Sequence, residues 1–285
     1  MSSLFDFDHH PDQYAVIGNP ISHSKSPKIH SLFAKQTKQK IEYQAIQVDP
    51  GGFEQAVGNF FANGGCGLNI TVPFKRDAWN IADLRSKRAE LAGAANTLLM
   101  NTDGEICAEN TDGIGLVNDL SNNHHITIKN KRILLLGAGG AARGVLQPLL
   151  YHHPHQLLIV NRTADKAVEL ADIFSSFGPI EGCGYDAIDQ QDFDIIINAT
   201  SASLKGDLPP LPENVVGPKS ICYDMMYSAD DTSFVAWSKN KAQLSVDGLG
   251  MLVEQAAESF FIWRGVRPDT QSVIAEIRRE LRSAS

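Results

Sequence analysis

The stretch from Arg132 to Gly144 reads RILLLGAGGAARG, and it predicts the fold of the region around it. The apolar residues 133–136 have the pattern of a buried strand that runs directly into glycines. Gly137, Gly139 and Ala142 match the G-x-G-x-x-A pattern of dinucleotide-binding strand–turn–helix units. Such glycines let backbone N–H groups approach a pyrophosphate, and the helix start adds a positive dipole end. A Rossmann-type unit is predicted; a glycine-rich turn without a ligand is the alternative.

The segment after this unit indicates which dinucleotide binds. A helix is predicted to about residue 150 and a strand at 157–160, which ends at Asn161, Arg162 and Thr163. The strand end lacks the Asp or Glu with which NAD enzymes usually hold the ribose 2′-OH. Arg162 can pair with a 2′-phosphate, and Lys166 adds a second positive charge. The pattern favours NADP over NAD; two merely solvated cations are the alternative.

Strand-like and helix-like segments alternate on both sides of this unit, which is typical of α/β folds with mostly parallel sheets. Strands are predicted at 14–18, 42–48, 67–72, 195–197 and 221–223, with a hairpin formed by 97–100 and 105–108. Helices are predicted at 27–36, 53–61, 112–120, 163–174, 249–263 and 270–281. The chain has 285 residues, which indicates roughly two domains.

Composition excludes several classes of protein. With 25 basic and 33 acidic residues the net charge is -8, which argues against nucleic-acid or acidic-membrane partners. No apolar run approaches the roughly 20 residues of a membrane helix, and no signal peptide is visible. The four cysteines are dispersed and the histidines lack ligand spacing, so no metal site is expected. These features predict a cytoplasmic protein with a small-molecule substrate.

Three segments in the first half carry chemistry-bearing residues. SHSKSP at 22–27 places two hydroxyls before a helix start that could bind a carboxylate, or simply cap the helix. NITVPFK at 69–75 ends a strand and places Lys75 at a helix start, where its charge is unfavourable; a surface lysine is the alternative. NTDG at 110–113 contains Asp112, which could act chemically or cap the next helix.

Together with other motifs, these segments closely resemble shikimate dehydrogenases of aromatic amino-acid (chorismate pathway) biosynthesis. The resemblance runs from about residue 15 to near the C-terminus. It is carried in order by GNPISHSKSP, NITVPFK, AGAANT, ENTDG, GAGGAARG, NRT, CYDMMY and DGLGMLVEQA. It implies an N-terminal α/β substrate domain (1–112), a doubly wound Rossmann-type NADP-binding domain (113–247) and C-terminal helices (248–285) that return to the substrate domain.

The resemblance also implies roles for individual residues. Lys75 and Asp112 match the family's catalytic pair. The expected substrate-binding set comprises Ser24, Ser26, Asn69, Thr71, Lys75, Asn96, Asp112, Tyr227 and Gln255. The expected NADP-binding set comprises Gly137, Ala138, Gly139, Gly140, Ala141, Asn161, Arg162, Thr163, Lys166, Met225 and Gly248. Departures from the family pattern are Lys166 in place of a common arginine, Met226 in place of a common aromatic residue, and the segment 201–207.

The implied reaction is the reversible NADPH-dependent reduction of 3-dehydroshikimate to shikimate. Lys75 would act as general acid or base and Asp112 would orient it. His23 is a rival acid–base group. A quinate/shikimate dehydrogenase with relaxed cofactor use and a catalytically silent dinucleotide-sensing regulator are the alternatives, and the enzyme is expected to be a monomer or homodimer.

Overall fold

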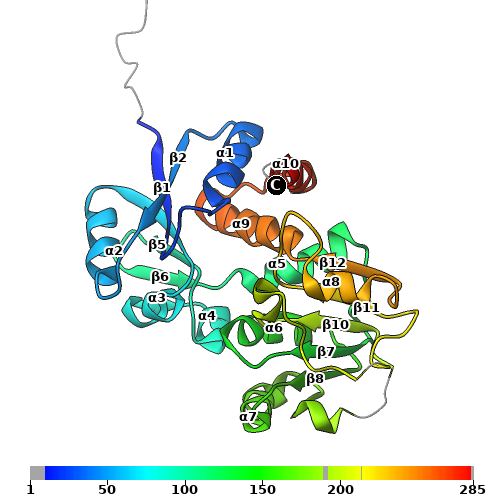
Figure 1. The fold of residues 1–285 in the computed structure, drawn as a ribbon. Coiled ribbons are helices and arrows are strands. Elements are labelled where there is room, and N and C mark those ends of the chain that lie inside the picture. Colours follow the sequence, from blue (N-terminus) through cyan, green and yellow to red (C-terminus); the bar gives the residue numbers. More distant parts are fainter. Residues whose placement is uncertain (1–9, 189–191, 213, 284–285) are drawn as a thin grey trace, which may run out of the picture.

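Two six-stranded sheets form the framework of the chain in the computed structural model, which describes residues 10–188, 192–212 and 214–283 (Figure 1). The first sheet has the strand order β2 (Ile41–Gln47), β1 (Asp12–Gly18), β3 (Gly65–Ile70), β5 (Thr97–Met100), β6 (Ile106–Glu109) and β4 (Leu84–Arg85). Strands β2, β1 and β3 run parallel, whereas β5 and β6 form the predicted antiparallel hairpin. The helices of this half are α1 (Ser26–Thr37), α2 (Phe53–Ala62), α3 (Lys75–Ile81) and α4 (Lys87–Ala92).

The second sheet is parallel throughout. Its order is β12 (Leu244–Asp247), β11 (Ile221–Asp224), β10 (Ile195–Asn198), β7 (Arg132–Leu136), β8 (Gln156–Val160) and β9 (Ile180–Cys183). The order reverses between β7 and β10, which gives the doubly wound arrangement of Rossmann folds and confirms the predicted fold class. Its helices are α6 (Gly140–Tyr151), α7 (Ala164–Phe174) and α8 (Ser233–Ser238). Single-turn segments lie at Ser175–Phe177, Tyr185–Ala187 and Ala202–Lys205.

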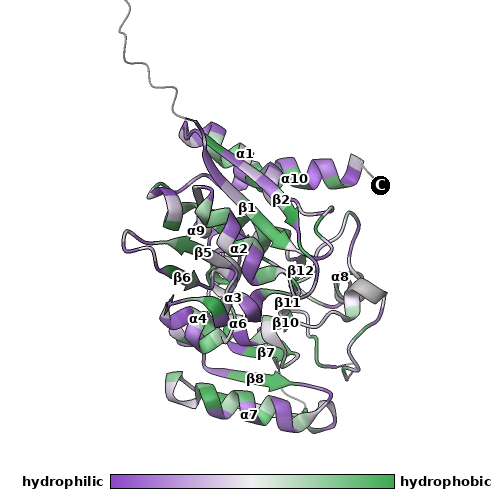
Figure 2. Ribbon diagram, turned by 90° about the vertical axis from the view of Figure 1, so that its left-hand side faces the viewer, coloured by the Kyte–Doolittle hydropathy of each residue, from purple (hydrophilic) through white to green (hydrophobic). Residues whose placement is uncertain are grey.

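Burial of apolar residues explains this half of the fold. The side chains of residues 133–136 in β7 are fully buried, because helices cover both faces of a parallel sheet. Figure 2 shows hydrophobic residues concentrated on β7 and β8, whereas α7 alternates hydrophobic and hydrophilic positions as a one-sided helix does. The predicted strands and helices of this half appear within a few residues of their expected bounds.

The helix α5 and a side-chain hydrogen bond link the two halves of the molecule. The helix α5 (Asp112–Asn118) continues into a π-helical turn at Asp119–Asn123, and it packs against both α6 and α9 (Leu249–Arg264). A second link is the Arg143 side chain of α6, whose Nε donates a hydrogen bond of 2.7 Å to the backbone oxygen of Leu91 in α4.

The last two helices pack mainly with the first half of the molecule, although Met251 of α9 also joins the core of the second half. Buried residues of α9 and α10 (Gln271–Ser283) share a hydrophobic cluster with Ile29 and Phe33 of α1. The Trp263 indole of α9 donates to the backbone oxygen of Leu98 in β5 at 3.2 Å. Figures 1 and 2 both place α10 beside α1, so distant ends of the sequence lie side by side.

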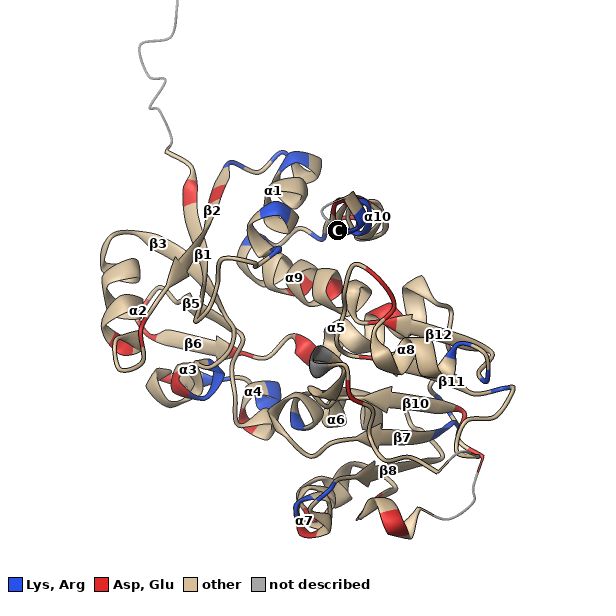
Figure 3. Cartoon of the chain, viewed as in Figure 1, with Lys and Arg blue, Asp and Glu red and all other residues tan. Residues whose placement is uncertain are grey.

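Charged residues occur around both sheets. Figure 3 shows basic residues on α1 and α4 and acidic residues on α9. Within the described residues, no helix is both long and apolar enough to span a membrane.

One buried histidine gives this fold a predictable acid sensitivity. His30 in α1 has no solvent exposure and stacks on Tyr43 with ring centroids 4.1 Å apart. Within the described parts of the chain, neither of its ring nitrogens has a well-formed hydrogen bond. Burial lowers its pKa from 6.5 to about 3, an effect that the nearby Asn69 side chain opposes only in part.

Because the unfolded histidine binds a proton below pH 6.5 and the folded one does not, stability is lost as pH falls from 6.5 towards 3. When the pH falls from 7.5 to 5.0, we expect the unfolding free energy of the wild type to decrease by about 2 kcal/mol more than that of His30→Phe. Urea unfolding at the two pH values measures this, with His155→Phe at an exposed histidine as the control. Equal pH-dependent losses in wild type and His30→Phe would contradict the assignment.

Candidate active site

A cavity of about 400 Å³ lies between the two halves of the molecule. Its walls come from the loop between β1 and α1, the ends of β3 and β5, the starts of α3, α5, α6 and α9, and the loop after β11. All nine residues of the predicted substrate-binding set line it: Ser24, Ser26, Asn69, Thr71, Lys75, Asn96, Asp112, Tyr227 and Gln255. Ala141, Met225 and Gly248 of the predicted cofactor set line the same cavity.

The predicted catalytic residues form an ion pair. Lys75 is the first residue of α3, and its Nζ lies 2.5 Å from Oδ2 of Asp112 at the start of α5. The alternative that Asp112 caps α5 is wrong, because Thr111 is the cap residue and the carboxylate points into the cavity wall instead. The alternative of a free surface lysine is also wrong, because only 32% of the Lys75 side chain is exposed. The pair therefore places a proton donor and its carboxylate partner at the cavity.

Asn96 connects this pair to the rest of the site. Its side chain is 2% exposed, and its Nδ2 lies 2.9 Å from Oδ1 of Asp112 and 3.2 Å from Oε1 of Gln255. Its Oδ1 accepts a hydrogen bond of 2.9 Å from the backbone N–H of Thr111. Both carboxylate oxygens of Asp112 are thus engaged, one by Lys75 and one by Asn96, which fixes the carboxylate orientation.

Asn69 is held firmly beneath the cavity. Its Nδ2 lies within 3.2 Å of three oxygens, including Oγ of Ser259 at 3.0 Å in α9. Its Oδ1 accepts a hydrogen bond of 2.8 Å from the Tyr43 hydroxyl. Thr71 follows at the end of β3, where its backbone N–H donates to Ile17 of the neighbouring strand. Both side chains are positioned by the sheet rather than by a loop.

The two predicted carboxylate-binding serines lie at the start of α1. The backbone N–H of Ser26 donates to Oγ of Ser24 at 3.3 Å, and Lys25 occupies the cap position without a side-chain cap bond. The reading of this segment as a plain side-chain cap is therefore wrong. The Lys25 Nζ is paired at 2.9 Å with Glu280 of α10, and Ser24, Lys25 and Ser26 all line the cavity.

Residues of the second half close the opposite wall. A Cβ added at Gly248 would lie 2.3 Å from the backbone oxygen of Met225, so only glycine fits this close approach. Tyr227 also lines the cavity, and burial, followed by the charge of Asp247, raises the pKa of its hydroxyl. The hydroxyl therefore stays protonated and can donate a hydrogen bond.

The predicted nucleotide-binding turn has the geometry of an anion cradle. Gly137 has φ +104°, a conformation that favours glycine, at the turn between β7 and α6. Gly139 and Gly140 are exposed, a Cβ at either would meet nothing within 4 Å, and the first turn of α6 has no acidic residue. Open space and free N–H groups at a helix start fit a pyrophosphate.

The end of β8 fits a 2′-phosphate better than a free 2′-OH. Asn161 donates from Nδ2 to the backbone oxygen of Thr163 at 2.9 Å, so the strand end presents an amide rather than a carboxylate. Arg162 and Lys166 are exposed, and neither forms an ion pair with any residue that the structure describes. Their charges remain available for an anionic ligand, which fits NADP.

Some residues of the cavity wall, and Thr111 directly behind it, were not singled out from the sequence. Thr111 is fully buried, and its Oγ1 donates to the backbone oxygen of Gln255 at 3.0 Å. Met251 and Leu252 of α9 line the cavity four and three residues before Gln255, a helical spacing that could have indicated them. The rival acid–base group His23 lines the cavity but is exposed. Among the described residues, no three His, Cys, Asp or Glu side chains are grouped to hold a metal.

Three family models match successive parts of the chain. Residues 16–98 match the shikimate dehydrogenase substrate binding domain. Residues 119–205 match the shikimate/quinate 5-dehydrogenase family, and residues 248–278 match the shikimate 5′-dehydrogenase C-terminal domain.

Individual relatives cover nearly the whole chain. A shikimate dehydrogenase (NADP(+)) of Methylococcus capsulatus is 54% identical over 96% of this chain and 99% of its own length. The crystal structure of an Ael1 enzyme from Pseudomonas putida has a TM-score of 0.88 and 50% identity, covering 93% of this chain and 97% of that one. A shikimate dehydrogenase solved in complex with NADP+ has a TM-score of 0.85 and 31% identity, covering 95% of this chain and 96% of that one.

Proposed function

Because this chain belongs to the shikimate dehydrogenase family, we propose that the cavity between its halves is the active site of an NADP-dependent shikimate dehydrogenase. The enzyme reduces 3-dehydroshikimate to shikimate reversibly, a step of aromatic amino-acid biosynthesis. The observation that carries this proposal is the Lys75–Asp112 pair at 2.5 Å in the cavity that Ser24, Ser26 and Gly248 also line.

Lys75 supplies the proton of the reduction. NADPH, when bound, delivers a hydride to the ketone carbon, and the carbonyl oxygen gains negative charge as the C–H bond forms. The Lys75 ammonium donates a proton to that oxygen, which gives the alcohol and neutral lysine. Asp112 accepts a hydrogen bond from the same ammonium and keeps it directed at the substrate. In the reverse reaction neutral Lys75 takes the hydroxyl proton as the hydride leaves.

The remaining cavity residues bind and orient the ring. Ser24, Ser26 and Tyr227 offer hydroxyl donors to the substrate carboxylate, while Asn96 and Gln255 face the ring hydroxyls near Asp112. Asn69 and Thr71 complete the floor from β3. Fixed donors of this kind place the ketone within hydrogen-bond reach of Lys75.

The proposed NADP-binding residues lie in three places: the turn after β7, the end of β8 and the wall of the cavity. The turn after β7 and the first residues of α6, Gly137 to Ala141, hold the pyrophosphate. Arg162 and Lys166 hold the 2′-phosphate beside Asn161 and Thr163. Met225 and Gly248 bring the nicotinamide end to the substrate cavity. We assign residues 1–112 and 248–285 to the substrate domain and residues 113–247 to the NADP-binding domain, in a cytoplasmic enzyme that is a monomer or homodimer.

Replacing Ser24 with alanine is expected to raise KM for 3-dehydroshikimate about tenfold with little change in kcat. The hydroxyl binds a carboxylate that does not change during the reaction, so its loss weakens binding and not the chemical step. Steady-state kinetics with saturating NADPH measure both constants. Ser31→Ala, an exposed serine of α1, is the matched control. An unchanged KM for Ser24→Ala would remove this residue from the site.

The proposal is tested by oxidation of shikimate or quinate with NADP+ or NAD+, in all four combinations. We expect the highest kcat/KM with shikimate and NADP+. Comparable efficiency with quinate or NAD+ would favour the relaxed quinate/shikimate dehydrogenase. NADP+ binding without oxidation of either substrate would favour the silent regulator.

A further inference from the structure

The last helix of the chain contacts both walls of the substrate cavity from outside. Glu280 of α10 forms an ion pair of 2.9 Å with Lys25, which lies between the two serines at the start of α1. Arg278, about half a turn earlier in α10, reaches the opposite wall instead. Figure 1 shows α10 beside α1, and Arg278 connects this helix to Asp247 at the end of β12.

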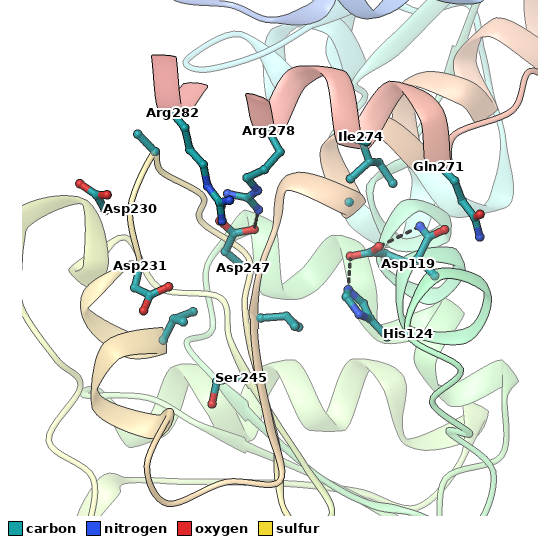
Figure 4. Close-up of a pocket in the computed structure, with 16 residues that line it drawn as sticks. Asp119, His124, Asp230, Asp231, Ser245, Asp247, Gln271, Ile274, Arg278 and Arg282 are labelled. Carbon is teal, nitrogen blue, oxygen red and sulfur yellow. Dashed lines mark hydrogen bonds and ion pairs between the residues drawn. The ribbon is translucent and has the colours of Figure 1, made fainter. Parts of the chain in front are cut away.

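Arg278 holds the segment that carries Tyr227. Its Nη1 donates to the backbone oxygen of Ser228 at 3.1 Å and to Oδ2 of Asp247 at 2.8 Å, and its Nη2 donates to Oδ1 of Asp247. Figure 4 shows the Arg278 side chain extending from α10 to the Asp247 carboxylate. The Arg278 side chain is 26% exposed and Asp247 only 9%, so the Asp247 carboxylate is largely buried, while both residues line an outer cavity of about 1010 Å³.

Asp247 is itself fixed to the start of α9. Its Oδ1 accepts a hydrogen bond of 3.2 Å from the backbone N–H of Leu249, and the neighbouring Gly248 N–H donates to the Met226 oxygen at 3.0 Å. The segment 226–228 is therefore held on one side by the β12–α9 junction and on the other by Arg278. The Ser228 hydroxyl donates to the nearby backbone oxygen of Asp230.

The same helix also lines the entrance to the cavity. A second cavity of about 800 Å³ shares His23, Ser24, Lys25 and the segment 225–227 with the first, and Glu280 and Leu281 line its outer side. The distance between the serines and Tyr227 across this entrance depends on how α10 holds the two walls.

We propose that Arg278 is a positioning residue for substrate binding, which fixes Tyr227 opposite Ser24 and Ser26 through its contacts with Ser228 and Asp247. The proposal rests on the proposed function, because it requires that this cavity bind 3-dehydroshikimate. Arg278 does not line the substrate cavity, and the Lys75–Asp112 pair lies on other elements. Its loss therefore affects substrate binding more than the chemical step.

Kinetics of Arg278→Ala test the proposal. We expect KM for 3-dehydroshikimate to rise about tenfold, with kcat within about twofold of wild type. Arg278→Lys, which keeps the charge but not the planar fork, should give an intermediate KM. Arg279→Ala is the control, since this neighbour is 74% exposed and, among the described residues, forms an ion pair only with Glu276 one turn away. An unchanged substrate KM in Arg278→Ala, or an equal rise in Arg279→Ala, overturns the proposal.

A double-mutant cycle with Tyr227→Phe tests whether Arg278 affects substrate binding through Tyr227. If Arg278 acts through Tyr227, its replacement should raise KM much less in the Tyr227→Phe background than in wild type. If the two replacements instead raise KM independently, so that their factors multiply, the proposal is overturned. Arg282 lies beside Arg278 in Figure 4, so Arg278→Ala/Arg282→Ala excludes compensation by this neighbour. Should Arg278→Ala not fold, Arg278→Lys carries the same test. A wild-type protein without any 3-dehydroshikimate reduction would instead refute the proposed function.

Discussion

Replacing Lys75 with alanine is expected to lower kcat for 3-dehydroshikimate reduction at least about 100-fold. In the proposed mechanism the Lys75 ammonium donates a proton to the developing alkoxide, and Asp112 holds it at 2.5 Å. Alanine leaves the ketone oxygen without this donor, so protonation must come from water. NADPH binding should be nearly intact, because the predicted cofactor groups lie at the turn between β7 and α6, between the end of β8 and the start of α7, after β11 and before α9, and not on α3.

The neighbouring Arg76 provides a matched control for this prediction. It follows Lys75 in α3 but is exposed, and Arg76→Ala should therefore keep kcat close to wild type. Steady-state rates give kcat, and quenching of protein fluorescence by NADPH gives the dissociation constant. A near-normal kcat in Lys75→Ala would refute its role and make His23 the stronger candidate for the acid–base group.

Removing both cations at the end of β8 is expected to lower kcat/KM for NADPH at least about 100-fold. Arg162 and Lys166 each contribute a charge-assisted contact to the 2′-phosphate, and each such contact is worth about 1.5–3 kcal/mol. NADH lacks this phosphate, so its kcat/KM should change little in Arg162→Ala/Lys166→Ala. The cofactor preference of the enzyme should therefore decrease by the same factor.

Lys219 provides the control for cofactor preference. It is exposed just before β11 begins, at the amino-terminal ends of the parallel strands, whereas Arg162 and Lys166 lie beyond the carboxyl end of β8. Lys219→Ala removes an equal charge from the same half of the protein but should leave both cofactors' kcat/KM unchanged. An equal decrease for NADPH and NADH in the double variant would show that the two cations do not contact the 2′-phosphate.

Most of the second sheet could be predicted from the sequence because its central strands are short, fully apolar runs. The edge strands β9 and β12 were not predicted, since their residues are only partly buried and show no apolar run. The helices α4 and α8 have six residues each, too few for a periodic pattern to appear.

The site residues could be identified individually, but their connections could not. Asn96 contacts Gln255, which is 159 positions away in the sequence, and no spacing rule relates the two. Likewise, nothing in the segment 270–281 indicates that Arg278 reaches Asp247, because that contact depends on how α10 packs against α1 and α9. Tertiary packing also decided that Asp112 pairs with Lys75 instead of capping α5.

The most direct measurement follows NADPH absorbance after 3-dehydroshikimate is added to the wild-type protein. We predict a steady loss of NADPH with one shikimate formed for each NADPH consumed, and a much slower loss when NADH replaces NADPH. No loss of NADPH, or a loss that does not depend on 3-dehydroshikimate, would contradict the assignment of this cavity as an NADPH-dependent 3-dehydroshikimate reductase site.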